Sequence, residues 1–174
     1  KSLSEFNMYN TTIIDVCSVK KYPVKVMQTL LPSEVGIIAS HPMFGPDSFT
    51  PFHDLKIVIH PVRDIHSQFQ IIKQVFERQS ITIIEMDPDT HDKNAAMSQG
   101  VTHFIGRVLE ESGITSTKIN TLGFNELLKV IEQTCHDSWN LFKDLQRYNP
   151  YTQVMVESLE KSIEIVHGKI VDNK

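Results

Sequence analysis

An apolar run at residues 35–39 stops at a histidine that two prolines and a glycine follow. A short apolar run with this ending is typical of a buried strand. Pro42 biases His41 toward an extended backbone, and Gly45 and Pro46 oppose the continuation of a helix or a strand. The pattern predicts His41 at the carboxyl end of a strand, where open α/β sheets place ligands and catalytic groups.

A second segment has the same design. The β-branched run at residues 11–16 predicts another strand, and Ser18 follows its end. If the two strands are parallel neighbours, Ser18 and His41 converge at one edge of the sheet. Two alternatives stay open, because Ser18 could cap a helix from Val19 and His41 could simply fix a turn at a strand end. Lys20 is expected to be a solvated helix residue.

Strands and helices alternate in the first half of the chain. Strands are predicted at residues 12–16, 35–40, 56–60 and 81–86, and helices at residues 23–31 and 62–79. This alternation is typical of an α/β domain.

The chain changes character after Asp87, where no further strand is predicted. Asp87 can serve as a helix N-cap with Pro88 in the first helical position, and this helix is expected to reach Glu111. Further helices are predicted at residues 123–133, 138–148 and 150–166. We therefore predict an α/β domain at residues 1–87, followed by an all-α domain at residues 88–174. Amphipathic helices of this kind often pack against a second copy, so a homodimer is expected.

The long helix after Asp87 has two different faces. At about 100° per residue, its large apolar side chains form one stripe, which consists of Met97, Val101, Phe104, Ile105 and Val108. His103 lies on the other side with Ala96, Gly100 and Arg107. Ala96 and Gly100 have almost no side chain, so a ligand or a neighbouring helix can approach closely beside His103. This histidine is a candidate for a ligand contact or for a hydrogen bond between helices.

Composition and charge argue against several classes of function. The net charge of the 174 residues is −4 and the basic residues are scattered, which is not typical of nucleic-acid binding. No stretch approaches the roughly 18 apolar residues that a membrane span needs. Cys17 and Cys135 are too few for a disulfide scaffold, so a cytoplasmic location is expected. The eight histidines form no His-x-x-x-His pair, and Cys-x-x-Cys is absent, so no metal site is predicted.

Three motifs together resemble the prephenate and arogenate dehydrogenase family of tyrosine biosynthesis. They are Asp15-Val16-Cys17-Ser18-Val19-Lys20, then His41-Pro42-Met43-Phe44-Gly45-Pro46-Asp47-Ser48, and then His91-Asp92-Lys93-Asn94 with Ser98-Gln99-Gly100-Val101-Thr102-His103-Phe104. The resemblance implies the end portion of a Rossmann-like sheet domain, followed by a helical substrate-binding and dimerisation domain. The family's glycine-rich dinucleotide-binding half is expected upstream of Lys1. The implied reaction is the oxidative decarboxylation of prephenate or arogenate with NAD or NADP.

The resemblance also implies roles for individual residues. His41 would accept a hydrogen bond from the ring hydroxyl of the substrate, as the catalytic base. Ser18, also catalytic, would contact the same hydroxyl close to the nicotinamide. His103 would lie in the substrate pocket near a carboxylate. The further contacts implied are Gln99 and Gly45 for the substrate, and Val16, Ser18 and Met43 for the cofactor.

One position departs from the family's pattern. Members that use prephenate commonly carry an arginine on the following helix, which grips a substrate carboxylate. An ungapped register places Asn125 there, and asparagine cannot supply that charge. We expect either a preference for arogenate, or a cation supplied by Arg107 or a partner chain. His91 and Asp92 match the family and are expected to stabilise the start of their helix.

The alternative function is a non-catalytic dimerisation or substrate-binding module derived from the same family. No Gly-x-Gly-x-x-Gly occurs among the seven glycines. That turn is what holds the pyrophosphate of a dinucleotide at the N-terminus of a helix. We therefore expect residues 1–174 alone to bind neither NAD nor NADP tightly, and to have no dehydrogenase activity.

Overall fold

The computed structural model describes residues 8–45 and 54–171. The chain divides into two compact units, Lys1–Asp92 (unit 1) and Lys93–Lys174 (unit 2). Among the described residues, the strands all belong to unit 1. Three residues of the predicted histidine motif, Pro46, Asp47 and Ser48, lie outside the described residues.

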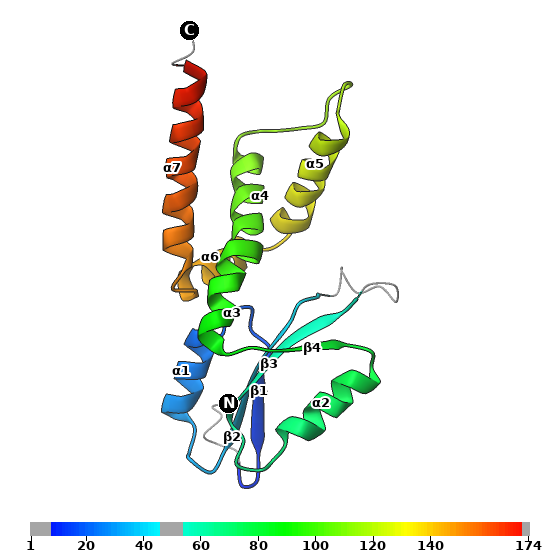
Figure 1. The fold of residues 1–174 in the computed structure, drawn as a ribbon, viewed down its shortest axis with the longest axis vertical. Helices are drawn as coiled ribbons and strands as arrows, with labels where there is room; N and C mark the ends of the chain where they lie inside the picture. The colour runs from blue at the N-terminus through cyan, green and yellow to red at the C-terminus, as the bar shows by residue number, and fades with distance from the viewer. Residues whose placement is uncertain (1–7, 46–53, 172–174) are drawn as a thin grey trace. The chain divides into compact units, whose positions relative to one another are not determined.

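Unit 1 is built on a mixed four-stranded sheet with the strand order β1-β2-β3-β4 (Figure 1). The strands are β1 (Thr12–Asp15), β2 (Gly36–Pro42), β3 (Lys56–Arg63) and β4 (Thr82–Glu85). β1 and β2 are parallel, β2 and β3 are antiparallel, and β3 and β4 are parallel. Because β1 and β2 are parallel neighbours, the segments after both strands leave from the same edge, as predicted for Ser18 and His41.

The helices α1 (Lys21–Leu30) and α2 (Phe69–Arg78) lie on opposite sides of the sheet (Figure 1). Successive side chains of a strand point to opposite faces, so Ile37 and Ile38 of β2 enter different cores. The core with Ile37 contains Leu31 and Val35, with Met8, Ile13, Met27 and Val62 packed against it. The core with Ile38 contains Ile59 and Phe69, with Ile72, Phe76 and Ile83 packed against it. A strand covered on both faces has a continuous apolar sequence rather than an alternating one.

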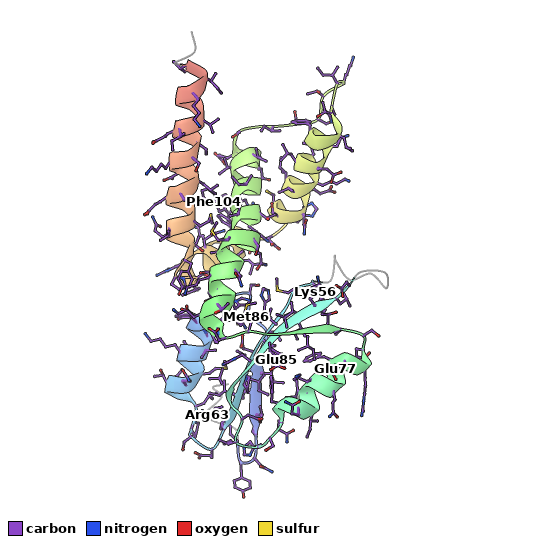
Figure 2. The ribbon with its side chains drawn as sticks, viewed as in Figure 1. Lys56, Arg63, Glu77, Glu85, Met86 and Phe104 are labelled. Carbon is purple, nitrogen blue, oxygen red and sulfur yellow. The ribbon has the colours of Figure 1, made fainter. Side chains whose placement is uncertain are left out.

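The helix predicted at residues 62–79 is shorter in the structure. β3 continues to Arg63, which pairs with Ile37, and α2 begins only at Phe69. Figure 2 labels Lys56 and Arg63, the two ends of β3. The carboxylate of Asp64 sets the start of α2, because it accepts the backbone N–H of Gln68 at 2.8 Å and that of Phe69 at 3.3 Å.

The regular elements of unit 2 are all helices among the described residues. The elements are α3 (Pro88–Ala95), the π-helical segment η3 (Ala96–Gly100), α4 (Val101–Glu111), α5 (Leu122–Cys135), α6 (Trp139–Tyr148) and α7 (Thr152–Val171); α3 begins in unit 1. The predicted N-cap is confirmed, because Asp87 accepts the N–H groups of Asp89 and Thr90 at 3.0 Å each. The predicted end at Glu111 is also confirmed. Within the described ranges, no helix is long and apolar enough to cross a membrane.

The inward face of the long helix is the one with small residues, not the apolar stripe. Ala96 and Gly106 are buried, whereas Met97 of the stripe is 68% exposed. A Cβ placed on Gly100 would lie 3.6 Å from the terminal methyl of Met155 in α7. The prediction that a neighbour approaches closely at Gly100 is therefore confirmed.

Candidate active site

A buried ion pair ties together the carboxyl ends of β1 and β2. Lys20 Nζ donates to the carboxylate of Asp15 and to the carbonyl of Ser40. The Ser40 hydroxyl donates to the carbonyl of Asp15 at 2.6 Å. Lys20 is 2% exposed, so the expectation of a solvated helix residue is wrong. α1 begins directly after Lys20. The Lys20 ammonium thus compensates the Asp15 carboxylate and the Ser40 carbonyl at the strand ends.

Ser18 lies half-buried between β1 and α1. The alternative that Ser18 caps the following helix is wrong, because α1 begins only at Lys21. The N–H groups of Lys20 and Lys21 instead donate to the two carboxylate oxygens of Asp92, at 2.8 and 2.9 Å. Among the described residues, the Ser18 hydroxyl has no hydrogen-bond partner. It can therefore serve a ligand.

His41 is a buried strand residue in contact with a second histidine. It lies in β2 and is 3% exposed. Its Nδ1 is 2.9 Å from His91 Nε2, and the two rings meet edge to face with centroids 5.1 Å apart. His91 Nδ1 in turn is 2.8 Å from Asp92 Oδ1. The expectation that His91 and Asp92 stabilise the start of their own helix is wrong, since Asp87 caps that helix and Asp92 caps α1.

The surroundings of His41 keep its imidazole neutral. Burial lowers the pKa of His41 from 6.5 to about 3, and the neighbouring His91 and Lys20 act in the same direction. Asp92 opposes them more weakly. A neutral imidazole has a free lone pair, which is what a general base or a hydrogen-bond acceptor needs.

The residues predicted to border the cofactor lie at the same edge of the sheet. Val16 follows β1 and is 67% exposed, and Met43 follows β2 and is also exposed. The Met43 N–H donates to the carbonyl of Lys56 at 2.9 Å, which holds this residue beside β3. Two exposed apolar side chains at adjacent strand ends suit a flat aromatic ring such as nicotinamide. Gly45 is exposed, and a Cβ added there would meet nothing within 4 Å.

The predicted substrate contacts Gln99 and His103 lie in unit 2, in a buried polar cluster with Arg107 and Gln146. Gln99, His103 and Arg107 are four residues apart and so share one side of the helix. Gln146 of α6 joins them by donating its Nε2 to the carbonyl of Gly100 at 3.3 Å. Within the described ranges, four buried atoms of this cluster lack hydrogen-bond partners: Gln99 Oε1, His103 Nδ1, Arg107 Nε and Gln146 Oε1. Buried polar atoms are seldom left unpaired, so the cluster fits the polar groups of a ligand.

Charged neighbours surround His103. Its Nδ1 lies 3.8 Å from Asp137 Oδ2, which is too far for a direct hydrogen bond. Burial lowers the pKa of His103, and Asp137 opposes that shift. The Arg107 guanidinium lies over the rings of Trp139 and Phe142, with its carbon 5.0 and 5.7 Å from their centroids.

Asn125, the position of the expected arginine, lies outside this cluster. It is exposed in the first turn of α5, and its Oδ1 accepts from Asn120 Nδ2 at 2.9 Å. A cavity of about 920 Å³ in unit 2 is lined by Phe104, Arg147 and other residues. Gln146 of the polar cluster also lines it, whereas His103 does not. Phe104 is labelled on α4 in Figure 2.

In the described ranges, no group of three His, Cys, Asp or Glu side chains could hold a metal ion.

Solved structures identify the class of fold. The structure of prephenate dehydrogenase from Aquifex aeolicus in complex with hydroxyphenyl propionate and NAD⁺ covers 93% of this chain with a TM-score of 0.70 and 17% identity, over 60% of its own length. Arogenate dehydrogenase from Synechocystis covers 93% of this chain with a TM-score of 0.66 and 17% identity, over 62% of its own length. The fold is that of a Rossmann-like dehydrogenase sheet followed by a helical domain.

Family models and curated relatives give the family. Residues 3–85 match the model described as "Prephenate dehydrogenase, nucleotide-binding domain", and residues 108–174 match "TYRAAT1-like, C-terminal domain". The chain is 38% identical over 167 residues to "Arogenate dehydrogenase 2, chloroplastic" of Arabidopsis thaliana, and 35% identical over 161 residues to "Arogenate dehydrogenase 1, chloroplastic". The chain belongs to the prephenate and arogenate dehydrogenase family. These matches cover 92% and 89% of the chain, but only 47% and 25% of the two relatives.

Proposed function

We propose that this chain forms part of an NAD(P)-dependent dehydrogenase that oxidatively decarboxylates arogenate or prephenate in tyrosine biosynthesis. The observation that carries the proposal is His41, a buried and neutral imidazole at the carboxyl end of β2, inside the family's motif. Among the described residues, its Nε2 makes no hydrogen bond and is left for a ligand. The curated relatives named as arogenate dehydrogenases support the choice of substrate class.

In this reaction the protein mainly has to position the substrate against the nicotinamide and to supply one hydrogen-bond acceptor for the substrate hydroxyl. When bound, an oxidised nicotinamide supplies the hydride acceptor. His41 Nε2 accepts a hydrogen bond from the C4 hydroxyl of the ring and stabilises the positive charge that grows there as hydride departs. The Ser18 hydroxyl orients that group. The ring carboxylate leaves as carbon dioxide, and its electron pair completes the aromatic ring, so the product keeps the hydroxyl.

The chain provides for only one end of the cofactor in this proposal. Val16, Ser18 and Met43 border the nicotinamide, because they lie exposed or half-buried at the ends of β1 and β2. The sequence has no Gly-x-Gly-x-x-Gly to hold the pyrophosphate. The bound NAD⁺ of the Aquifex aeolicus enzyme supports a nicotinamide dinucleotide, and either NAD or NADP meets the chemical need.

The helices of unit 2 contribute substrate contacts and a dimer interface in this proposal. The unpartnered atoms of Gln99 and His103 suit the hydroxyl or carboxylate groups of a substrate. Ile163, Val166 and Ile170 of α7 are exposed apolar side chains on one side of that helix, which suits packing against a second copy. The cytoplasmic location expected from the sequence stays a prediction.

The test is an assay of the full-length protein with arogenate and with prephenate, each with NAD and with NADP. We expect reduced nicotinamide and carbon dioxide to form in equal amounts with at least one combination. His41→Asn should strongly reduce that activity while the protein still folds. Substrate binding without turnover in every combination would favour the alternative, a non-catalytic binding or dimerisation module.

A further inference from the structure

A chain of hydrogen bonds leads from His41 to a fully buried carboxylate. His41 Nδ1 contacts His91 Nε2 at 2.9 Å, and His91 Nδ1 contacts Asp92 Oδ1 at 2.8 Å. His91 is 2% exposed and Asp92 is 0% exposed. The Asp92 carboxylate also accepts hydrogen bonds from the backbone N–H groups of Lys20 and Lys21, so it contacts three nitrogen atoms in all.

The order of these contacts fixes where the ring protons are. A carboxylate only accepts hydrogen bonds, so His91 Nδ1 must carry a proton toward Asp92. When His91 carries only this one ring proton, its other nitrogen is bare, and His91 Nε2 is an acceptor. Two bare nitrogens would repel each other at 2.9 Å, so His41 Nδ1 must carry a proton toward His91. His41 Nε2 is thereby left with its lone pair free.

We propose that His91 and Asp92 are positioning residues that hold His41 in the tautomer whose Nε2 can accept the proton or hydrogen bond of the substrate. This inference rests on the proposed function, because it assigns Nε2 of His41 to the substrate hydroxyl. A histidine that relays between a buried carboxylate and the base plays the part that the carboxylate alone plays in a Ser-His-Asp triad. The negative charge of Asp92 then stabilises positive charge that develops on His41.

The alternative is that Asp92 acts only as the cap of α1, with His91 as packing. Capping explains the two backbone N–H groups, but it does not explain why His91 inserts between Asp92 and His41. A purely structural role predicts lower stability for variants, with no change in the tautomer of His41.

The direct test is nitrogen NMR of the full-length protein labelled with ¹⁵N-histidine, which distinguishes the two neutral tautomers of an imidazole. We expect His41 to carry its proton on Nδ1. In His91→Leu, which has no acceptor, we expect the proton of His41 to shift to Nε2 in a substantial fraction of molecules. A proton on Nε2 in the unmodified protein would overturn the proposal, and that result would mean a doubly protonated His91 donates to His41.

Kinetics of the same variants test the consequence. His91→Leu should lower kcat on the order of 10²-fold, the lower range for loss of a general base, and change KM far less. His91→Gln, whose amide oxygen can accept from His41 Nδ1, should recover part of that loss. Asp92→Asn should also lower kcat, and Asp64→Asn is its matched control. Both carboxylates cap a helix in unit 1, but only Asp92 contacts His91. Equal kcat in these two variants would overturn the positioning role.

The two measurements separate this inference from the proposed function. If the full-length protein has no dehydrogenase activity, the proposed function fails, while the NMR tautomer still decides whether the hydrogen-bond chain holds His41. If the enzyme is active and His91→Leu changes neither tautomer nor kcat, the positioning role fails and the proposed function stands.

Discussion

Gly106 of α4 lies directly against Thr134 of α5: a Cβ on Gly106 would be 3.2 Å from the Thr134 Cβ and 3.4 Å from the carbonyl oxygen of Val130. The two helices approach closely because this position has no side chain. Gly106→Ala should therefore lower the free energy of unfolding by about 1–3 kcal/mol, the usual cost of overpacking. Urea denaturation of the full-length protein measures the change.

Gly168 in α7 is the control for this substitution, since a Cβ there would meet nothing within 4 Å. Gly168→Ala should raise the free energy of unfolding by about 0.5–1 kcal/mol, because alanine loses less backbone entropy in a helix. Similar effects of the two alanines would contradict the close packing of α4 on α5.

His41→Asn should reduce kcat of the full-length enzyme by a factor on the order of 10² to 10⁴, the usual contribution of a general base. Substrate affinity should fall less, because asparagine keeps some hydrogen-bonding capacity. Ser18→Ala should cost less than His41→Asn if the serine only orients the hydroxyl. A larger loss for Ser18→Ala would mean that the two roles are reversed.

Stability should fall in acid because His41 is buried in its neutral form. The pKa of His41 is about 3 in the folded protein, against an ordinary value of 6.5. Between these values the unfolded chain binds a proton that the folded chain does not, so stability present above pH 6.5 is lost as the pH falls. The loss amounts to about 2 kcal/mol at about pH 5. Urea denaturation at neutral pH and in acid should show this loss, and His41→Asn should lack that part of it.

Lys20→Met should be strongly destabilising, by about 3–5 kcal/mol, because it leaves the buried Asp15 carboxylate without its cation. Lys56→Met is the matched control, since Lys56 pairs with Asp54 at 3.3 Å on the surface. That variant should change stability by less than about 1 kcal/mol. Thermal or urea unfolding of both variants compares the pairs, and equal losses would show that Lys20 is not held as described.

The exposed apolar side of α7 should support a dimer. Ile163→Glu with Ile170→Glu should shift the full-length protein toward monomer in light scattering, because both side chains lie on that side of the helix. Lys161→Glu, about half a turn away, should leave the assembly unchanged. A protein that is monomeric at micromolar concentration before any substitution would contradict the predicted homodimer.

The sequence predicts best what depends on neighbouring residues. The strand that ends at Pro42 follows from an apolar run and a proline, and the helix start at Asp87 follows from one N-cap. The predicted start of α6 at Ser138 is likewise confirmed, because the Ser138 hydroxyl accepts a hydrogen bond from the N–H of Leu141 at 3.2 Å. These signals are local, so no distant partner can change them.

The errors concern polar residues whose partners are distant in sequence. Lys20 follows a strand and resembles a surface lysine, and only the folded sheet brings it against Asp15 and the Ser40 carbonyl. Asp92 caps a helix 71 residues earlier in the chain, which no local pattern reveals.

The hydrogen-bond chain of His41 has a consequence for the order in which the protein is made. The histidine motif leaves the ribosome 50 residues before His91, the residue that contacts His41. Until that later part of unit 1 has been synthesised and folded against β2, His41 lacks the hydrogen-bond partner that sets its tautomer. The histidine motif is translated early, but His41 can act as a base in the required tautomer only after His91 and Asp92 at the end of unit 1 have folded against it.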